Sequence, residues 1–298
     1  MNKFIRLYLW ICIFFLTFWI SAEWIEGYKD SYYTHKYRQV KDSPAITTLL
    51  MGSSYMENCL NPHLLQENDS IYDFAISGRW IFWDVRLAEK LFPTMPNLKT
   101  VLFPIGYEAL YNSMHYQSNS TEEDELYMFK YAKYMHIYYD RLPQRFTCRS
   151  ALYTNQFRHK TWKDISYDSL GYLPIEGQSP KWEMHINQNL IHTANAQDCY
   201  QEYVSYVMDL ARICQKNDIR LIAITFPCAD YYVKQIPQKA IDDLNSLIDS
   251  VLSHYPMEYH NYLNDKEFRA DSIYYNANHL NSIGADMFAL RVKEDFNL

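Results

Sequence analysis

Apolar runs alternate with amphipathic stretches along most of the chain after residue 44. The runs LKTVLFPIG and IRLIAITFP are continuously apolar and end at Gly or Pro, which is typical of strands buried on both faces of a sheet. Because strands alternate with helices, we expect an α/β fold with a doubly wound, mainly parallel sheet. The full pattern predicts strands at 45–52, 71–77, 98–105, 219–226 and 258–263, and helices at 80–92, 197–216, 237–253 and 281–295.

The alternation is interrupted between residues 107 and 196, where Tyr, His, Asn and Gln are frequent. A structureless loop of that length is unusual in a compact domain. We therefore expect a large insertion, with a helix at 121–141, that folds over the carboxyl edge of the sheet as a lid or a substrate platform.

The most apolar stretch lies near the amino terminus, LYLWICIFFLTFWISA at residues 7–22, and it follows Lys3 and Arg6. A basic flank before such a stretch is typical of an export signal. We favour a transmembrane signal-anchor over residues 1–25, because the bulky aromatic side chains suit a membrane. Cleavage after Ala22 is the alternative.

The orientation of this segment decides where the rest of the chain lies. Basic residues that flank a first hydrophobic segment stay on the cytoplasmic side. We therefore expect a single-pass protein of the cytoplasmic (inner) membrane, held through residues 7–25. A stalk at 26–43 would lead to an extracytoplasmic α/β domain at 44–298.

The composition bears on several classes of function. The formal net charge is −7 and no basic cluster follows residue 41, so nucleic-acid binding is not expected. With Cys12 in the anchor, the six cysteines leave an odd number beyond it, and no disulfide framework is implied. We predict no metal site, since His136, His185 and His192 are better interpreted as solvated or stacked side chains. No phosphate-cradling glycine loop is present either, so no nucleotide cofactor is implied.

The candidate chemistry lies at the two ends of the predicted sheet domain. Gly52-Ser53-Ser54 directly follows the first strand, and ligands of open α/β sheets bind at the carboxyl ends of strands. A serine hydroxyl is a poor nucleophile until a base removes its proton. His279, in the late segment NANHLNSIG, is the natural base if the two loops meet above one sheet.

At these residues the chain resembles the SGNH hydrolase superfamily. The blocks that carry the resemblance are GSSYMENCLNPHLL, AISGRW, PIGYEALY and NHLNSIGADMF, and they span the chain from about residue 44 to its end apart from the insertion. The Gly-Ser-Ser block is similar to that of the membrane-tethered branch, which includes the D-alanyl transfer protein of teichoic-acid modification and, more loosely, the alginate O-acetyltransferases. The resemblance implies the three-layer, flavodoxin-like arrangement of this superfamily.

The resemblance also implies roles for single residues. Ser54 corresponds to the nucleophile, His279 to the general base, and the backbone N–H groups of Ser54 and Gly78 to an oxyanion hole. The family's third donor, an Asn, is absent from GYEAL, where Glu108 stands instead. Asn112 or another amide from the insertion would have to replace that donor.

The largest departure lies three residues before His279, where Asn276 replaces the family's aspartate. An amide oxygen accepts a hydrogen bond from the imidazole, but it does not stabilise imidazolium as a carboxylate does. Asp265 and Asp271 are upstream acids that could supply the charge instead. A serine–histidine dyad and a degenerate enzyme both stay open.

These observations predict a membrane-tethered serine acyl esterase or O-acyltransferase that acts on a cell-envelope glycan or another acyl ester. The resemblance further suggests a membrane-embedded acyltransferase as a partner. The alternative is a catalytically degenerate protein that binds glycan or scaffolds an envelope-assembly complex, and a plain structural membrane-anchored protein is a third possibility.

Overall fold

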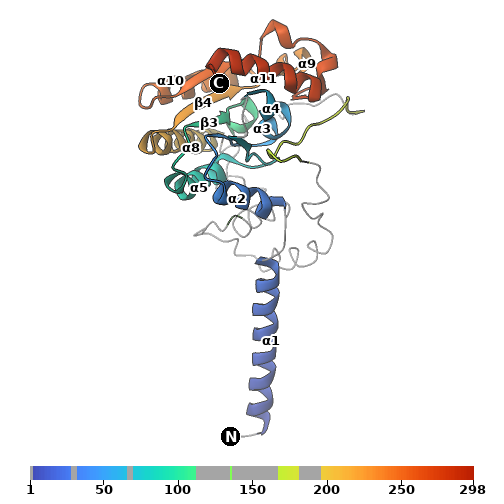
Figure 1. Cartoon of the computed structure of the whole chain (residues 1–298), viewed down its shortest axis with the longest axis vertical. Helices are drawn as coiled ribbons and strands as arrows, with labels where there is room; N and C mark the ends of the chain where they lie inside the picture. Colours follow the sequence, from blue (N-terminus) through green and yellow to red (C-terminus); the bar gives the residue numbers. More distant parts are fainter. Residues whose placement is uncertain (1–2, 28–31, 66–69, 112–134, 136–166, 181–195) are drawn as a thin grey trace. The chain divides into compact units, whose positions relative to one another are not determined.

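The computed structural model describes residues 3–27, 32–65, 70–111, 135, 167–180 and 196–298. These residues fall into two compact units, of which the larger comprises 38–121 and 166–298. The smaller unit contains helix α1 (Lys3–Gly27), which covers the predicted anchor (Figure 1).

Over the part of the chain that the structure describes, no helix has both the length and the apolar character needed to cross a membrane.

The larger unit is built on one parallel sheet of five strands, in the order β2-β1-β3-β4-β5. Each strand falls inside a predicted range, so the predicted α/β fold with a parallel sheet is confirmed. The strands are β1 (Thr48–Leu50), β2 (Ile71–Asp73), β3 (Thr100–Pro104), β4 (Arg220–Thr225) and β5 (Glu258–Asn261). The chain crosses from β2 over β1 to β3, so the strand order reverses between β1 and β3. In open α/β sheets a crevice forms at that point, outside the carboxyl ends of the strands.

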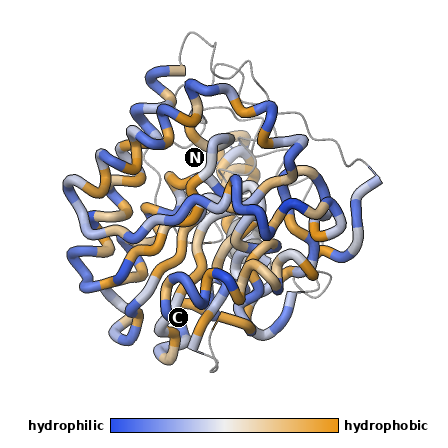
Figure 2. The backbone as a smooth tube through the Cα atoms, turned by 90° about the horizontal axis from the view of Figure 1, so that it is seen from above, coloured by the Kyte–Doolittle hydropathy of each residue, from blue (hydrophilic) through white to orange (hydrophobic). Residues whose placement is uncertain are grey.

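Helices cover the sheet in two groups. Helix α8 contacts α5 and α10, whereas α11 contacts α3 and α4. All residues of β1 and β2 are buried, and because successive side chains point to opposite faces, both faces of the sheet are covered. Figure 2 shows apolar stretches gathered in the interior and hydrophilic ones outside. The helices are α3 (Ser54–Cys59), α4 (Pro62–Leu65), α5 (Ile81–Leu91), α8 (Ala196–Lys216), α9 (Asp230–Val233), α10 (Gln238–Leu252) and α11 (Ser282–Phe296).

A hairpin and a helix were among the elements that were not predicted from the sequence. A short antiparallel hairpin of β6 (Tyr274–Asn276) and β7 (His279–Leu280) lies just before α11. Within the predicted stalk, Tyr32–Asp42 forms helix α2, in which Val40 is buried.

Most of the predicted insertion, including the helix expected at 121–141, lies outside the described residues. Its described stretch at residues 167–180 runs beside the carboxyl end of β2. The Asp73 N–H donates to the Leu170 carbonyl at 2.7 Å, and the Leu173 N–H donates to that of Glu57 at 3.2 Å. Further along, the Ser282 N–H donates to the Ile175 carbonyl at 2.8 Å. This stretch thus ties β2 and α3 to the start of α11.

Candidate active site

A tight turn at the end of β1 presents the candidate nucleophile. Gly52 has φ +116°, a conformation that side chains oppose, and a Cβ there would lie 2.4 Å from Pro104 Cδ. Glycine therefore lets the end of β1 approach the end of β3 closely. Ser53 then occupies the N-cap position and Ser54 begins α3. The Ser54 hydroxyl lies at the carboxyl ends of the two strands between which the sheet order reverses.

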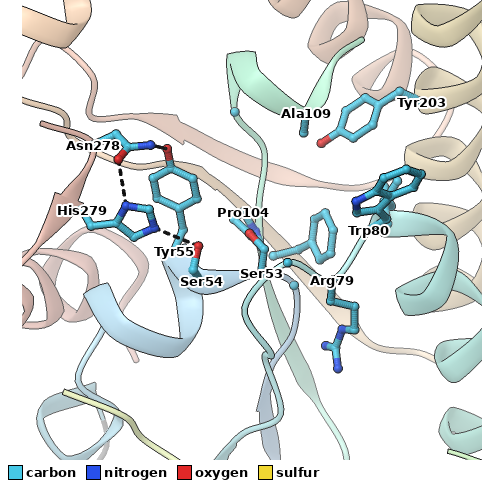
Figure 3. A pocket seen from close by; sticks show the side chains of 15 residues that line it. Ser53, Ser54, Tyr55, Arg79, Trp80, Pro104, Ala109, Tyr203, Asn278 and His279 are labelled. Carbon is cyan, nitrogen blue, oxygen red and sulfur yellow. Dashed lines mark hydrogen bonds between the residues drawn. The ribbon is translucent and has the colours of Figure 1, made fainter. Parts of the chain in front are cut away.

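His279 reaches this serine from the far end of the chain. Its Nε2 lies 2.8 Å from Ser54 Oγ, across 225 residues of sequence (Figure 3). The expectation that the two loops meet above one sheet is confirmed. The β6–β7 hairpin and the start of α11 hold the histidine there.

The other imidazole nitrogen faces two amides. His279 Nδ1 lies 2.8 Å from Asn278 Oδ1 and 3.2 Å from Asn276 Oδ1. An amide oxygen only accepts, so Nδ1 carries the proton and Nε2 is left to accept from the Ser54 hydroxyl. The closer acceptor is Asn278, whereas the sequence pointed to Asn276. Asn276 instead accepts the backbone N–H of His279 at 2.9 Å and that of Asn278 at 3.2 Å, which shapes the hairpin turn.

Tyr55 supports this arrangement from two directions. Its ring stacks on the imidazole of His279, with ring centroids 4.9 Å apart and planes 10° apart. Its hydroxyl accepts a hydrogen bond from Asn278 Nδ2 at 3.0 Å, which turns the Asn278 oxygen toward the histidine. Tyr55 was not among the residues predicted from the sequence, although it directly follows Ser54. Adjacency in sequence carries no information about stacking on a residue of another element.

Among the residues that the structure describes, no carboxylate hydrogen-bonds to this imidazole. Burial lowers the pKa of His279 to about 4. Asp265, one of the two suggested acids, accepts the Glu267 N–H, and the other, Asp271, is exposed. The ring is therefore neutral at pH 7, as a general base has to be.

A cavity of about 250 Å³ opens beside Ser54. The backbone of Gly78, which has φ +73°, borders it. Figure 3 shows His279 and Asn278 on one side of Ser54, and Trp80 and Tyr203 on the other. The lining residues are Gly52, Ser53, Ser54, Tyr55, Gly78, Arg79, Trp80, Ile81, Phe103, Pro104, Gly106, Ala109, Tyr203, Asn278 and His279. The ends of the strands before Ser54, Gly78 and Gly106 thus meet at one edge of the sheet.

A buried ion pair links the two loops that border this cavity. Arg79 Nη2 lies 2.6 Å from Asp84 Oδ1, and neither side chain is exposed. Asp84 Oδ1 also accepts the Gly52 N–H at 3.1 Å, while Arg79 Nη1 donates to the Phe74 carbonyl at 2.8 Å. Burial raises the pKa of Asp84 to about 6, and the nearby Arg79 opposes that shift. The pair therefore joins the loop that precedes Ser54 to the loop that contains Gly78.

Glu57 makes a second link between these loops. Its carboxyl group is buried in α3 and accepts the Ser77 N–H at 2.8 Å, together with the Ser77 hydroxyl. Burial raises the pKa of this carboxyl to about 8. Glu57, Arg79 and Asp84 were not predicted from the sequence either. The one signal in the sequence was a charged residue among mainly apolar neighbours.

Asn112, His136, His185 and His192 lie outside the described residues, as does the side chain of Glu108. Within the described ranges, no three His, Cys, Asp or Glu side chains gather as a metal site would need. The five described cysteines are free thiols.

Neither a protein-family model nor a curated protein matches the sequence. The fold is similar to three solved structures. A "putative acylhydrolase" from Bacteroides fragilis is 11% identical, over 84% of this chain and 86% of that one, with a TM-score of 0.41. A "putative platelet activating factor" from Streptococcus pneumonia is 11% identical, over 97% and 99%, with a TM-score of 0.46. A GDSL-like lipase from Bacteroides thetaiotaomicron is 9% identical, over 89% and 98%, with a TM-score of 0.45.

The third of these structures carries the description of a GDSL-like lipase. At such identities the likeness concerns the fold alone. The membrane-tethered branch stays a prediction.

Proposed function

We propose that this protein is a serine acyl esterase or O-acyltransferase in which Ser54 is the nucleophile. The observation that carries the proposal is the 2.8 Å contact between Ser54 Oγ and His279 Nε2 at the edge of a cavity. A nucleophile within hydrogen-bond reach of a neutral base, which a third group orients, is the arrangement that acyl transfer requires.

The proposed reaction has two halves. His279 Nε2 takes the Ser54 proton as Oγ attacks the ester carbonyl, and the N–H groups of Ser54 and Gly78 receive the developing oxyanion. Nε2 then returns the proton to the leaving alcohol as the bond between the carbonyl carbon and that oxygen breaks. Water or a sugar hydroxyl removes the acyl group from Ser54 by the same steps.

The amides of Asn276 and Asn278 limit the rate that Ser54 and His279 can reach. Asn278 holds the productive tautomer of His279, because its oxygen accepts from Nδ1. A neutral amide, however, stabilises the imidazolium formed during attack less than a carboxylate would. We expect a slow enzyme, although its nucleophile and its base already lie within hydrogen-bond distance of each other.

The setting of the reaction is part of the same proposal. The basic flank and apolar stretch at residues 7–22 support export and tethering to the cytoplasmic membrane. The sequence blocks support a cell-envelope glycan as the acyl acceptor or donor, and a membrane-embedded acyltransferase as partner. Digesting intact spheroplasts with external protease tests the orientation. Protection of the domain beyond residue 30 until lysis would contradict it.

One observation favours a second candidate function. Both acceptors of the His279 Nδ1 proton are amides, at 2.8 and 3.2 Å, which suits a protein that has lost catalysis and retains binding. Such a protein would bind glycan or scaffold an envelope-assembly complex.

A fluorophosphonate probe separates the two functions, since it modifies only an activated serine. Intact-mass spectrometry should find one adduct on the wild-type protein. Ser54→Ala and His279→Ala should remove it. The matched control is Ser53→Ala, which changes the neighbouring hydroxyl and should only weaken labelling. No adduct on the wild type, and none after Asn276→Asp or Asn278→Asp, would favour the binding function.

A further inference from the structure

The ring of Tyr55 lies nearly parallel to the imidazole of His279 (Figure 3). The two ring centroids are 4.9 Å apart and the planes differ by 10°. Tyr55 is buried, and the ring of Phe226 packs against it with the centroids 5.6 Å apart. Asn278 Nδ2 donates to the Tyr55 hydroxyl at 3.0 Å, so the far edge of the ring is fixed as well. The face of an aromatic ring is therefore held beside the proposed base.

Attack by Ser54 puts a positive charge on this imidazole. As the bond from Ser54 Oγ to the carbonyl carbon forms, the hydroxyl proton moves to His279 Nε2, which lies 2.8 Å away, and the ring becomes imidazolium. The charge spreads over both nitrogens of the ring that stacks on Tyr55. The face of an aromatic ring attracts a cation within about 6 Å of its centroid, and the attraction is stronger where the pair is desolvated. The neutral imidazole of the resting protein gains much less from the same contact.

We propose that the π face of Tyr55 stabilises the imidazolium that forms on His279 during attack. The inference rests on the proposed function. Asn278 and Asn276 accept from His279 Nδ1 and orient the ring, but their amides carry no net charge. The face of the tyrosine ring carries the negative part of its quadrupole, so it supplies some of the electrostatic stabilisation that a carboxylate would supply. Because this stabilisation is stronger in the transition state than in the resting protein, it raises the rate of attack and leaves substrate binding unchanged.

Two substitutions separate the ring of Tyr55 from its hydroxyl. Tyr55→Phe keeps the ring and removes the hydrogen bond from Asn278, so the maximal rate at which a fluorophosphonate labels Ser54 should fall only about threefold. Tyr55→Leu removes the ring as well, and that rate should fall about 10- to 30-fold. The probe concentration that gives half of the maximal rate should not change in either variant, since the proposed effect is on attack and not on binding.

The sharper test changes the electrostatics of the ring and keeps its shape. Phenylalanine and its analogues with one, two and three ring fluorines replace Tyr55 in the full-length protein. Each fluorine withdraws electron density from the face of the ring, so the labelling rate should fall stepwise, by about tenfold over the series. The matched control is the same series in place of Phe268, which is buried and packs against Phe288 with the centroids 5.4 Å apart. There the labelling rate should stay constant.

Equal labelling rates over the series that replaces Tyr55 would overturn the proposal. An equal fall in the series that replaces Phe268 would overturn it too, because the loss would then come from packing. Failure of the proposed function itself has a different signature, since the wild type would form no adduct at Ser54. In that case NMR of the His279 ring decides, because it needs no turnover. The pH at which His279 takes up a proton should fall over the fluorinated series, and a constant value would overturn the proposal.

Discussion

The residues that hold the site on the two sides of Ser54 differ in their charge. On one side His279 is oriented by the amides of Asn278 and Asn276 and by the ring of Tyr55, all of them neutral. On the other side, the loops that carry the proposed oxyanion donors rest on a fully buried ion pair of Arg79 and Asp84. His279, which has to change its protonation state, is thus oriented by uncharged groups. The loops that carry the proposed oxyanion donors, which have to stay still, are held by charged groups.

This difference has a physical reason. A buried ion pair is costly to desolvate and penalises any arrangement that separates its partners, so it specifies one loop geometry. A carboxylate beside the imidazole would raise its pKa, whereas amides orient the ring and leave its pKa low. The rigidity of the loops therefore depends on the Arg79–Asp84 side, and the basicity of His279 depends on the amide side. Each can be tested by changing charge on one side only.

The largest expected effect comes from breaking the charged side. Asp84→Leu leaves the Arg79 guanidinium buried without its partner, and we expect the free energy of unfolding to fall by about 3–5 kcal/mol. Urea denaturation monitored by tryptophan fluorescence measures the change.

The matched control removes an exposed ion pair. Asp209→Ala disrupts the surface pair with Arg212 and should cost at most about 0.5 kcal/mol. In the double variant Arg79→Met/Asp84→Leu no charge is left unpaired, and much of the loss should be recovered. Equal, small losses for Asp84→Leu and Asp209→Ala would show that the buried pair does not hold the loops.

The next effect comes from adding charge to the neutral side. Asn278→Asp places a carboxylate at the position that now lies 2.8 Å from His279 Nδ1, where it stabilises imidazolium. We expect kcat/KM toward a neutral ester to rise about 10- to 100-fold, within the few kcal/mol that such stabilisation contributes.

Asn276→Asp is the comparison variant. This variant should raise activity less. The Asn276 Oδ1 atom lies 3.2 Å from His279 Nδ1 and also accepts two backbone N–H groups. If Asn276→Asp gave the larger gain, Asn276 rather than Asn278 would be the acceptor that matters.

The neutral side also predicts an unusual pH profile. The pKa of His279 is lowered from 6.5 to about 4, so the base form persists well below the pH at which an ordinary histidine charges. Activity should remain nearly constant from pH 7 to pH 5 and fall around pH 4. The kcat/KM profile of the wild type measures this, and the acid limb should move upward in Asn278→Asp.

The lowered pKa of His279 also makes the free energy of unfolding depend on pH. The unfolded chain takes up a proton at His279 below about pH 6.5 and the folded protein only near pH 4, so the free energy of unfolding falls as the pH drops through that window. An acid limb near 6.5 in the wild-type activity profile would contradict the neutral arrangement.

The last effect concerns Glu57. Burial raises its pKa from 4.5 to about 8, so the folded protein binds its proton more tightly than the unfolded chain does. The contribution is present below pH 4.5 and is lost as the pH rises toward 8. Glu57→Gln should therefore flatten the stability profile, because it raises the free energy of unfolding more at pH 8 than at pH 5. Glu258→Gln, at an exposed pair with Arg220, is the control and should not flatten it. Parallel profiles for Glu57→Gln and the wild type would contradict the raised pKa.

Several features of the molecule followed from the sequence alone. Continuous apolar runs ending at Gly or Pro predicted the central strands, and the alternation of strands and helices predicted a parallel sheet. The order of Ser54 and His279, each next to a predicted element end, was enough to propose that they meet. These inferences succeeded because hydrophobic periodicity and turn chemistry are local properties that burial in the fold reinforces.

Other features were decided only by the tertiary structure. The sequence pointed to Asn276, but the hairpin decided that Asn278 is the closer acceptor of the histidine proton while Asn276 holds the turn. The burial of the Arg79–Asp84 pair beneath Gly52 and the stacking of Tyr55 on His279 join residues of different elements. Such contacts depend on the angles at which strands, turns and helices pack, and no local pattern encodes those angles. The sequence therefore determined which residues could react, and the packing of distant elements decided which neighbours hold them and with what charge.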